Sequence, residues 1–215
     1  MRTQFANRAE AGELLARKLE KYKNRDDVLV LALPRGGVPV GFVVAGRLRA
    51  PLDVLIVRKI GVPGQEELAM GAIAAGGVRI LNARVIETLQ ITKEAVEAVV
   101  AREQRELERR EESYRGGRTA PPVLGRTVIL VDDGIATGST MRSAIGVLRR
   151  QKAQKVVVAT PTIAASTLKG MRGDADEIVA VLVPEDFVGV GQWYSDFSQT
   201  SDAEVQRLLA LAARP

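Results

Sequence analysis

The chain has 215 residues, 46% of them hydrophobic and 27% charged, a size and balance typical of one globular domain with a sizeable core. The absence of Cys and His excludes disulfides, thiolate nucleophiles, Cys-based zinc sites and Ser-His-Asp triads, so acid–base work falls to Asp, Glu, Lys, Tyr or water. The formal net charge of +5 comes from Lys and Arg interleaved with Glu, which favours a solubilising surface over a nucleic-acid footprint.

The first part of the chain predicts helices that alternate with buried strands. Asn7 is suited to cap the first helix. Continuous apolar runs bounded by charged residues or Pro predict strands that are buried on both faces. In order, we expect a helix over 8–22, a strand over 28–33, a helix with Pro39 in its first turn that continues to Leu48, a strand over 52–57 and a short strand over 71–74.

The second part of the chain begins with a long, charged helix from Lys93 to about Tyr114, capped by Thr92 and carrying a thin apolar stripe. This helix is either a solvated surface helix or a lid or dimer element, and the sequence favours neither. A loop with Gly and Pro leads to Arg126. We then expect a strand over 128–131, a helix over 139–148, strands over 155–159 and 177–183, and a last helix opened by the capping box of Ser201 and Glu204.

This order of elements predicts an α/β fold with a parallel sheet that helices cover on both faces. Ligands in such folds bind beyond the carboxyl ends of the strands, so the loops after strands are the first candidates for a site. No apolar run reaches the ~20 residues that cross a bilayer, and the N-terminus lacks the apolar segment of a secretion signal. We therefore expect a cytoplasmic protein without a membrane partner.

Residues 128–144, which read VILVDDGIATGSTMRSA, carry the most specific signal. A strand followed by a small-residue loop that opens a helix aims free backbone N–H groups and a positive helix end at one point, which suits a phosphate. Asp132 and Asp133 beside this loop fit a sugar with vicinal hydroxyls, contacted directly or through a shared divalent ion. An ordinary strand–helix turn would leave this double Asp unexplained, and a Walker A loop would need a Lys that is missing.

This stretch resembles the motif that binds 5-phosphoribosyl 1-pyrophosphate (PRPP) in type I phosphoribosyltransferases: an apolar strand, two acidic residues and Thr-Gly-x-Thr. The segments LALPRGGVPV, VRKIGVPGQEELAMGA and VDDGIATGST also recur together in bacterial predicted phosphoribosyltransferases of undefined acceptor. The resemblance implies a Rossmann-like parallel-sheet domain over 1–215, with a core over about 25–183 and a small C-terminal hood over about 184–200 plus the last helix. It also implies that Asp132 and Asp133 hold the ribose hydroxyls, directly or through Mg²⁺ and water. The implied ligands of the 5′-phosphate are Ala136, Thr137, Gly138, Ser139 and Thr140.

Two more loops follow predicted strands and carry cations. Arg35 and Gly36 lie where backbone can approach a ligand closely, and the resemblance implies that they bind the pyrophosphate of PRPP, often through a strained peptide bond. Arg58 and Lys59 are costly at a strand end unless they meet an anion. In the resembled family, the Gly- and Pro-rich segment that continues to Glu67 is a flexible loop that closes over the substrate. In that case the two cations neutralise the leaving pyrophosphate; plain structural turns are the alternative for both loops.

The segment 184–194 gathers aromatic residues in a chain with few of them. It is similar to the hood of hypoxanthine–guanine phosphoribosyltransferases, so Phe187 is our candidate for stacking on a base. Trp193 is equally suited to closing a core or dimer surface. Ala136 replaces an acidic residue of those enzymes, and 161–165 lacks their Lys. The loop thus looks more like that of adenine phosphoribosyltransferases and argues against a 6-oxopurine acceptor.

These patterns predict a Mg²⁺-dependent enzyme of nucleotide metabolism and salvage that transfers phosphoribosyl from PRPP to a nitrogenous acceptor, such as a nucleobase, and releases pyrophosphate. Asp132, Asp133, Arg58 and Lys59 would carry the catalysis. The resembled family commonly forms homodimers, and we expect no nucleic-acid partner. A PRPP-sensing regulator without transferase activity is the alternative, and a structural phosphate-binding module, which would not need the two Asp residues, is a third possibility.

Overall fold

The structure is a computed structural model that describes residues 4–213. Within this range, five strands form a parallel sheet, the main sheet, and three form an antiparallel sheet, the small sheet. The main sheet contains, in spatial order, β2 (Leu52–Val54), β1 (Val28–Ala32), β6 (Thr127–Val131), β7 (Lys155–Thr162) and β8 (Glu177–Leu182). The small sheet contains β3 (Val57–Val62), β4 (Gln65–Ala74) and β5 (Val78–Leu81).

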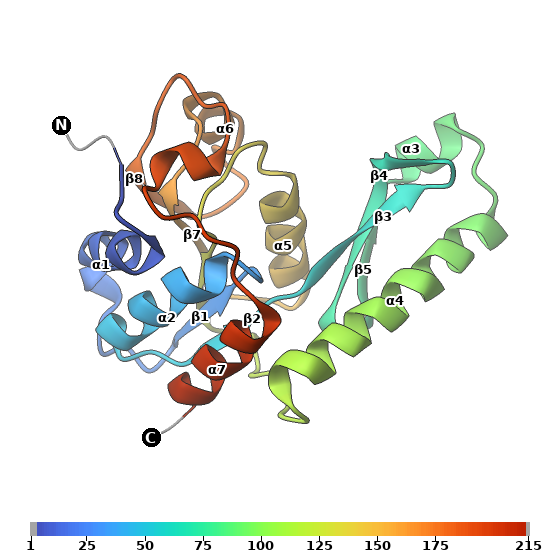
Figure 1. Cartoon of the computed structure of the whole chain (residues 1–215). Coiled ribbons are helices and arrows are strands. Elements are labelled where there is room, and N and C mark those ends of the chain that lie inside the picture. The colour runs from blue at the N-terminus through green and yellow to red at the C-terminus, as the bar shows by residue number, and fades with distance from the viewer. Residues whose placement is uncertain (1–3, 214–215) are drawn as a thin grey trace.

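Helices surround the main sheet, and the small sheet projects to one side of it (Figure 1). The longer helices are α1 (Arg8–Lys18), α2 (Gly37–Leu48), α4 (Lys93–Arg115), α5 (Ser139–Arg150) and α7 (Asp202–Ala212). Shorter ones are α3 (Ala83–Thr88), α6 (Ala165–Gly170) and the 3₁₀ turns η1 (Glu20–Tyr22), η2 (Ala75–Gly77) and η3 (Val190–Trp193). Every helix in the described part of the chain is too short or too polar to cross a lipid bilayer.

The main sheet is buried on both faces, as its apolar strands predict. Successive residues of β1 point to opposite faces. Val28 and Val30 join the core cluster formed with α1 and α2, whereas Leu29 and Leu31 join the cluster formed with α5. Strands β6 and β7 alternate in the same way. The prediction of an α/β fold with a covered parallel sheet is therefore confirmed.

The prediction of one strand over 52–57 is wrong. β2 ends at Val54, and β3 begins at Val57 in the small sheet. The apolar run hides this break because Leu55 and Ile56 are both buried, but in different core clusters. A chain that passes from one core to another remains apolar throughout, so hydropathy does not mark the crossing.

The segment after Arg58 is a hairpin and not the loop that we predicted. β3 and β4 pair antiparallel, with Lys59 opposite Ala72 and a turn in which Gly64 has a φ of +76°. The short strand predicted over 71–74 is the end of the longer β4. The charged and Gly-containing start of β4 is exposed, and this composition made a strand look like a loop.

Helix α4 lies along the small sheet, which has α5 on its other side (Figure 1). Its apolar stripe is buried against the sheet and α7, with Val99 and Leu107 packed near Ile60 and Met70. Arg115 at its end donates from Nε to Asp53 Oδ2 at 2.9 Å and from Nη2 to the Val54 carbonyl at 2.9 Å. The apolar stripe of α4, whose role the sequence alone could not decide, is thus buried within the chain.

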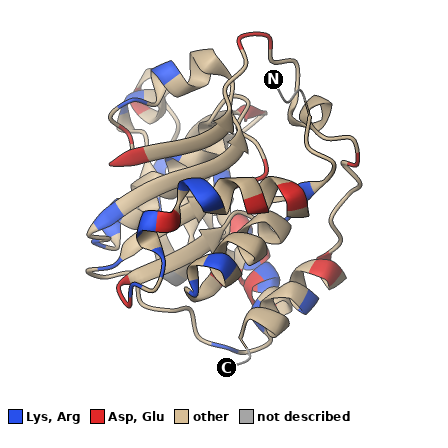
Figure 2. Ribbon diagram, turned by 90° about the vertical axis from the view of Figure 1, so that its left-hand side faces the viewer, with Lys and Arg blue, Asp and Glu red and all other residues tan. Residues whose placement is uncertain are grey.

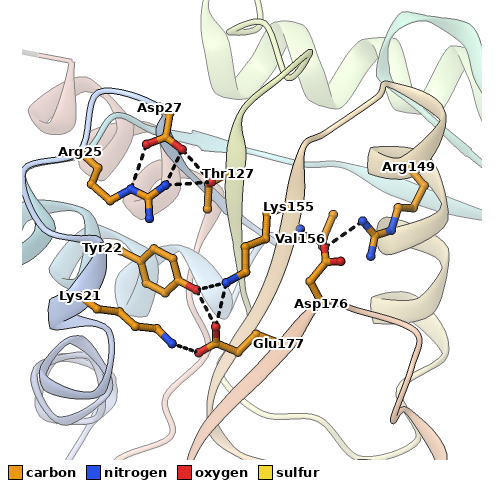
Figure 3. Close-up of polar contacts among 10 residues, drawn as sticks. All are labelled: Lys21, Tyr22, Arg25, Asp27, Thr127, Arg149, Lys155, Val156, Asp176 and Glu177. Carbon is orange, nitrogen blue, oxygen red and sulfur yellow. Dashed lines mark hydrogen bonds and ion pairs between the residues drawn. The ribbon is translucent and has the colours of Figure 1, made fainter.

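Charged residues at the amino ends of the main-sheet strands are paired with one another (Figure 3). Glu177 accepts hydrogen bonds from the Tyr22 hydroxyl at 2.6 Å and from Lys155 Nζ at 3.1 Å. Lys21 Nζ lies 2.7 Å from its other carboxylate oxygen. Asp27 likewise accepts from the Thr127 hydroxyl at 2.8 Å. We call this region the amino edge of the main sheet.

The predicted helix starts are confirmed at three places. Asn7, Thr92 and Ser201 each accept a hydrogen bond, through their side-chain oxygen, from the backbone N–H three residues further on, at 3.0, 3.2 and 3.1 Å. These bonds satisfy N–H groups that a helix leaves without an intrahelical partner. The first helix ends earlier than predicted, at Lys18, and the chain continues to Tyr22 as a 3₁₀ turn.

Candidate functional site

The loops after β1 and β6 lie side by side at the carboxyl edge of the main sheet, because these strands are neighbours in it. Leu33 N donates to the Val131 carbonyl at 2.8 Å. Gly36 lies so close to Asp133 that a Cβ built on it would be 2.0 Å from Oδ2. The peptide bond before Arg35 is cis. The sequence-predicted loops 34–37 and 132–140 are thus brought together, with glycine at their contact.

Asp132 and Asp133 form an acid pair at this edge. Asp132 Oδ1 accepts from the backbone N–H of Asp133 at 2.9 Å, while Oδ2 has no hydrogen-bond donor among the described residues. Asp133 Oδ2 accepts from Arg8 Nε at 2.8 Å, and the Asp133 carbonyl accepts from the Tyr194 hydroxyl at 2.5 Å. The two carboxylates are therefore held differently, and among the described residues each keeps one oxygen without a donor, Oδ2 of Asp132 and Oδ1 of Asp133.

Burial governs the pKa of both carboxyls. It raises the pKa of Asp132 well above its ordinary range, and the charge on Asp133 raises it further. Burial also raises the pKa of Asp133, although Arg8 opposes this change. Carboxylates that are desolvated beside one another gain from any nearby cation or hydroxyl donor. The acid pair therefore suits a metal ion or a sugar with neighbouring hydroxyls.

The loop that follows the acid pair is fixed through its carbonyl groups. The Thr167 hydroxyl donates to the Ala136 carbonyl, and Arg142 Nη1 donates to the Thr137 carbonyl at 3.0 Å. Gly138, with a φ of +74°, then opens α5. This left-handed conformation is one that glycine adopts at no steric cost. The carbonyl oxygens are thereby turned toward the protein and away from any ligand at the open edge.

The N–H groups of the same loop have few partners. Those of Ala136, Thr137 and Gly138 make no hydrogen bond within the part of the chain that the structure describes, and Ser139 N has a long contact of 3.5 Å with the Thr137 hydroxyl. Ala136, Thr137, Ser139 and Thr140 are exposed. Free N–H donors at a helix N-terminus form a site for an anion such as phosphate. The predicted phosphate-binding residues are thus together in a suitable arrangement.

The candidate cations are paired with carboxylates other than the acid pair. Arg35 is 40% exposed, and its Nη1 is 3.8 Å from Asp202 Oδ1 at the start of α7. Arg58 donates to Glu103 of α4 at 2.9 and 2.5 Å. Lys59 Nζ contacts the carbonyl and carboxylate of Glu67 at 3.1 and 3.2 Å. The structure records no contact of Arg58 or Lys59 with the acid pair or with the phosphate loop in the described range.

The hood packs on the acid pair. Val190 fills the space beside Gly134, where a Cβ would be 2.3 Å from its Cγ1. The Phe187 ring is half-buried, with its centroid 6.0 Å from that of Trp193. Tyr194 is buried and stacks near Phe197 at 5.1 Å. Base stacking by Phe187 stays a prediction, since its recorded ring partner is Trp193.

Sequence reasoning missed Arg8, which reaches the acid pair from the first turn of α1. Along the chain it is 125 residues from Asp133, and no local motif distinguishes it from other basic residues of that helix. Its position next to the cap residue Asn7 indicates a helix start but does not indicate which residue Arg8 contacts. A contact of this kind comes from tertiary structure alone.

The acid pair fits Mg²⁺ by the chemistry of its donors. Magnesium prefers carboxylate and water oxygens and usually keeps several waters, with one or two protein carboxylates. Asp132 offers a free oxygen at an open edge. The described residues contain no group of three or more acidic side chains that would form a complete protein cage. Any ion here would share its ligands with water or substrate.

Lys and Arg are interspersed with Asp and Glu over the ribbon, without a stripe of one sign (Figure 2). Many of the surface cations are paired with acidic neighbours, as are Arg47 with Glu13 and Arg79 with Glu97. A nucleic-acid footprint needs basic residues gathered on one face. The basic positions in this view of the ribbon are not gathered in this way.

A family model for the phosphoribosyl transferase domain matches residues 3–194, and the chain belongs to this family. It is 48% identical over 210 residues to two Mycobacterium tuberculosis proteins, MT0597 and Rv0571c, which are provisionally named phosphoribosyl transferases. That match covers 98% of this chain and 47% of each relative, so the chain spans about half the length of the curated relatives it matches.

Solved structures resemble this chain over nearly its whole length. The protein TT1426 from Thermus thermophilus is 39% identical, with a TM-score of 0.88 and coverage of 98% of this chain and 100% of that one. A hypothetical protein from Neisseria gonorrhoeae, 12% identical, has a TM-score of 0.53 and coverage of 98% of both chains. The second likeness concerns the fold alone.

Proposed function

We propose that the chain transfers the phosphoribosyl group of PRPP to a nitrogen of a small acceptor, such as a nucleobase, and releases pyrophosphate. The observation that carries this proposal is the acid pair placed directly before a loop of free N–H donors, in a member of the phosphoribosyl transferase domain family. The N–H groups of 136–140 would bind the 5′-phosphate. Asp132 and Asp133 would accept hydrogen bonds from the ribose hydroxyls.

The reaction itself asks little covalent chemistry of the protein. The bond between ribose C1 and the pyrophosphate oxygen breaks, and its electron pair leaves with pyrophosphate through an oxocarbenium-like state. The acceptor nitrogen forms a bond to C1 from the opposite face and loses its proton to solvent. The chain's residues would hold the two reactants in line and stabilise the charge on the departing group. Arg35 and Gly36 are our candidates for holding the pyrophosphate.

We infer that the reaction depends on Mg²⁺. Asp132 and Asp133 would hold the ion through water or the ribose hydroxyls. When bound, it would neutralise part of the negative charge of PRPP. The free oxygen of Asp132 supports this assignment.

The remaining site residues would have to move or rearrange. Arg58 and Lys59 would exchange their carboxylates, Glu103 and Glu67, for pyrophosphate oxygens. For this exchange, the hairpin of β3 and β4 that carries them would have to approach the carboxyl edge of the main sheet. Phe187 would stack on the acceptor base.

A PRPP-sensing regulator is the second candidate function. The observation that favours it is the engagement of Arg58 by Glu103, whose side chain is only 10% exposed. A cation held by a buried carboxylate is not readily available to a leaving group. A chain of this kind would bind PRPP at the acid pair and the phosphate loop without turning it over.

The deciding experiment measures pyrophosphate release from PRPP and Mg²⁺ in the presence of a panel of purines, pyrimidines and small amines. We expect release with one class of acceptor, and loss of release when the metal is chelated. Asp132→Asn combined with Asp133→Asn should abolish release, and circular dichroism should show that the variant keeps the wild-type fold. Full activity of this double variant would contradict the site. PRPP binding without release for any acceptor would support the regulator.

Further expectations concern the location of the protein and its partners. We propose that it acts in the cytoplasm as a homodimer, and size-exclusion chromatography with light scattering would measure the second point. A salt-dependent gel shift with RNA or DNA would contradict the expectation that it has no nucleic-acid partner.

A further inference from the structure

Arg8 joins three parts of the molecule. Its Nε donates to Asp133 Oδ2 at 2.8 Å, and its Nη1 donates to the Ser198 carbonyl of the hood at 2.7 Å. Its guanidinium lies over the Phe197 ring, with Cζ 4.1 Å from the centroid, and 5.9 Å from the centroid of the Tyr194 ring. One side chain from α1 thus contacts both the acid pair and the hood.

The contact is well shielded from water. The side chains of Arg8 and Asp133 are 12% and 13% exposed. A shielded ion pair with additional hydrogen bonds holds its partners in one geometry, and removing one partner leaves the other charge uncompensated. The planar fork of Arg allows an ion pair, a carbonyl contact and ring stacking at the same time, which a Lys ammonium does not.

Tyr194 completes the link from the hood side, because its hydroxyl donates to the Asp133 carbonyl at 2.5 Å. The hood therefore contacts the side chain of Asp133 through Arg8 and its main chain through Tyr194. Asp133 is thus engaged at its side chain and at its main chain, and it lies close against Gly36.

We propose that Arg8 is a positioning residue that fastens the hood segment 194–198 to the acid pair, so that the sugar-binding and acceptor-binding sides of the site are set together. This inference rests on the proposed function for its effect on turnover. The fastening itself is a property of the free protein. Arg8 does not contact the reacting atoms in this scheme; it acts through Asp133 and the hood.

The test compares Arg8→Met and Arg8→Lys with Arg17→Met, a control at an exposed position of the same helix. Two quantities are measured: kcat and KM for PRPP and acceptor, and acrylamide quenching of fluorescence from Trp193, the single Trp of the chain. Arg8→Met should lower kcat/KM roughly 10- to 100-fold, the usual range for residues that orient a ligand-holding group. It should also make Trp193 more accessible to quencher.

The pattern across variants separates positioning from general stability. Arg8→Lys keeps the charge without the fork, so it should recover part of kcat/KM while the quenching stays raised. Arg17→Met should match the wild type in both measurements. A folded Arg8→Met protein with wild-type kcat/KM and wild-type quenching would overturn the proposal.

Two provisions keep the test decisive. If Arg8→Met does not fold, Phe197→Leu is used instead, because it removes the ring under the guanidinium and leaves the ion pair. Phe197→Leu should raise the quenching of Trp193 and lower kcat/KM by less than the roughly 10- to 100-fold expected for Arg8→Met. Wild-type values of both quantities in Phe197→Leu would overturn the proposal. If the wild-type protein releases no pyrophosphate, the proposed function fails. In that case quenching alone still decides whether Arg8 fastens the hood.

Discussion

Gly36 and Gly46 lie in the same region of the chain, at the start and near the end of α2, yet their surroundings differ completely. A Cβ on Gly36 would be 2.0 Å from Asp133 Oδ2, whereas a Cβ on Gly46 meets nothing within 4 Å. Gly36 has an ordinary right-handed backbone, with a φ of −59° and a ψ of −32°. A side chain at position 36 is therefore excluded by the space that the acid pair occupies and not by the backbone conformation.

Gly36→Ala should consequently impair the site more than the fold. The added methyl group must displace the Asp133 carboxylate or the loop 34–37. We expect a loss of roughly 10- to 100-fold in kcat/KM, as for other changes that disturb the support of a functional carboxylate. Steady-state kinetics of pyrophosphate release measure this effect.

Gly46→Ala is the matched control for this substitution. It should leave kcat/KM unchanged and stabilise the protein by about 0.5–1 kcal/mol, because Ala loses less conformational freedom in a helix than Gly. Wild-type kinetics in Gly36→Ala would contradict the close contact between Gly36 and Asp133.

At the residue scale, sequence predicted local features and missed a distant one. Asp132, Asp133 and the loop 136–140 form one contiguous motif, so their chemistry could be read from the order of residue types. Arg8 is far from this motif along the chain, and its neighbours signal a helix start alone. The pairing of two residues that are distant in the sequence depends on the packed fold, and no short stretch of sequence shows it.

At the element scale, Arg115 connects the two sheets. It is buried at the end of α4 and donates to Asp53 and to the Val54 carbonyl, at the place where the chain leaves the main sheet for the small sheet. It also donates to Glu111 of its own helix. This contact fixes α4, and with it the small sheet, to the edge of the main sheet.

Arg115→Met should destabilise the protein by about 3–5 kcal/mol, because it leaves the Asp53 carboxylate buried without its cation. Urea denaturation measures this change. Arg105→Met, at an exposed position of the same helix, should remain within roughly 0.5 kcal/mol of the wild type. A second change, Asp53→Leu, should recover part of the loss from Arg115→Met, and no recovery would argue against an uncompensated charge as its cause.

Most strands of the main sheet were predictable, whereas the end of β2 and most of the small sheet were not. β1, β6 and β7 are apolar on both faces, so each stands out as a continuous run bounded by polar residues. β4 begins with four exposed residues and becomes buried toward its end. A strand that changes from exposed to buried along its length gives neither a continuous apolar run nor a regular alternation.

At the scale of the whole molecule, the two edges of the main sheet use charge differently. At the amino edge, acidic and basic side chains are paired (Figure 3). Burial raises the pKa of Glu177, but hydrogen bonds from Lys21, Tyr22 and Lys155 outweigh it and bring the pKa to about 2. At the carboxyl edge, N–H donors and a carboxylate oxygen lack partners within the described range. The polar groups at the amino edge are thus paired within the chain, whereas several at the carboxyl edge are available to a ligand.

Glu177→Gln should therefore lower the melting temperature in a pH-dependent way. The ordinary pKa of this carboxyl, 4.5, falls to about 2 on folding, so ionised Glu177 stabilises the protein above about pH 4.5 and loses this effect as the pH falls toward 2. The difference from the wild type should be largest near neutral pH and shrink on acidification. Thermal melts from pH 7 to pH 3 measure it.

Glu185→Gln, at an exposed hood position, serves as the control and should show no such trend. A deficit of Glu177→Gln that is constant across the pH range would indicate that the substitution acts through packing and not through the charge of the carboxylate.

The contact of Arg8 with Ser198 joins residues that are 190 positions apart in the sequence. During synthesis from the N-terminus, the main sheet can form once β8 has left the ribosome, but the hood cannot yet reach α1. The nascent chain would therefore acquire its fold before it acquires a finished site. An incomplete chain that ends after Leu182 would carry the phosphate loop, both Asp residues and Arg8. It would lack the contacts from Tyr194 to Asp133 and from Arg8 to Ser198, so premature termination would give a product whose site is only partly assembled.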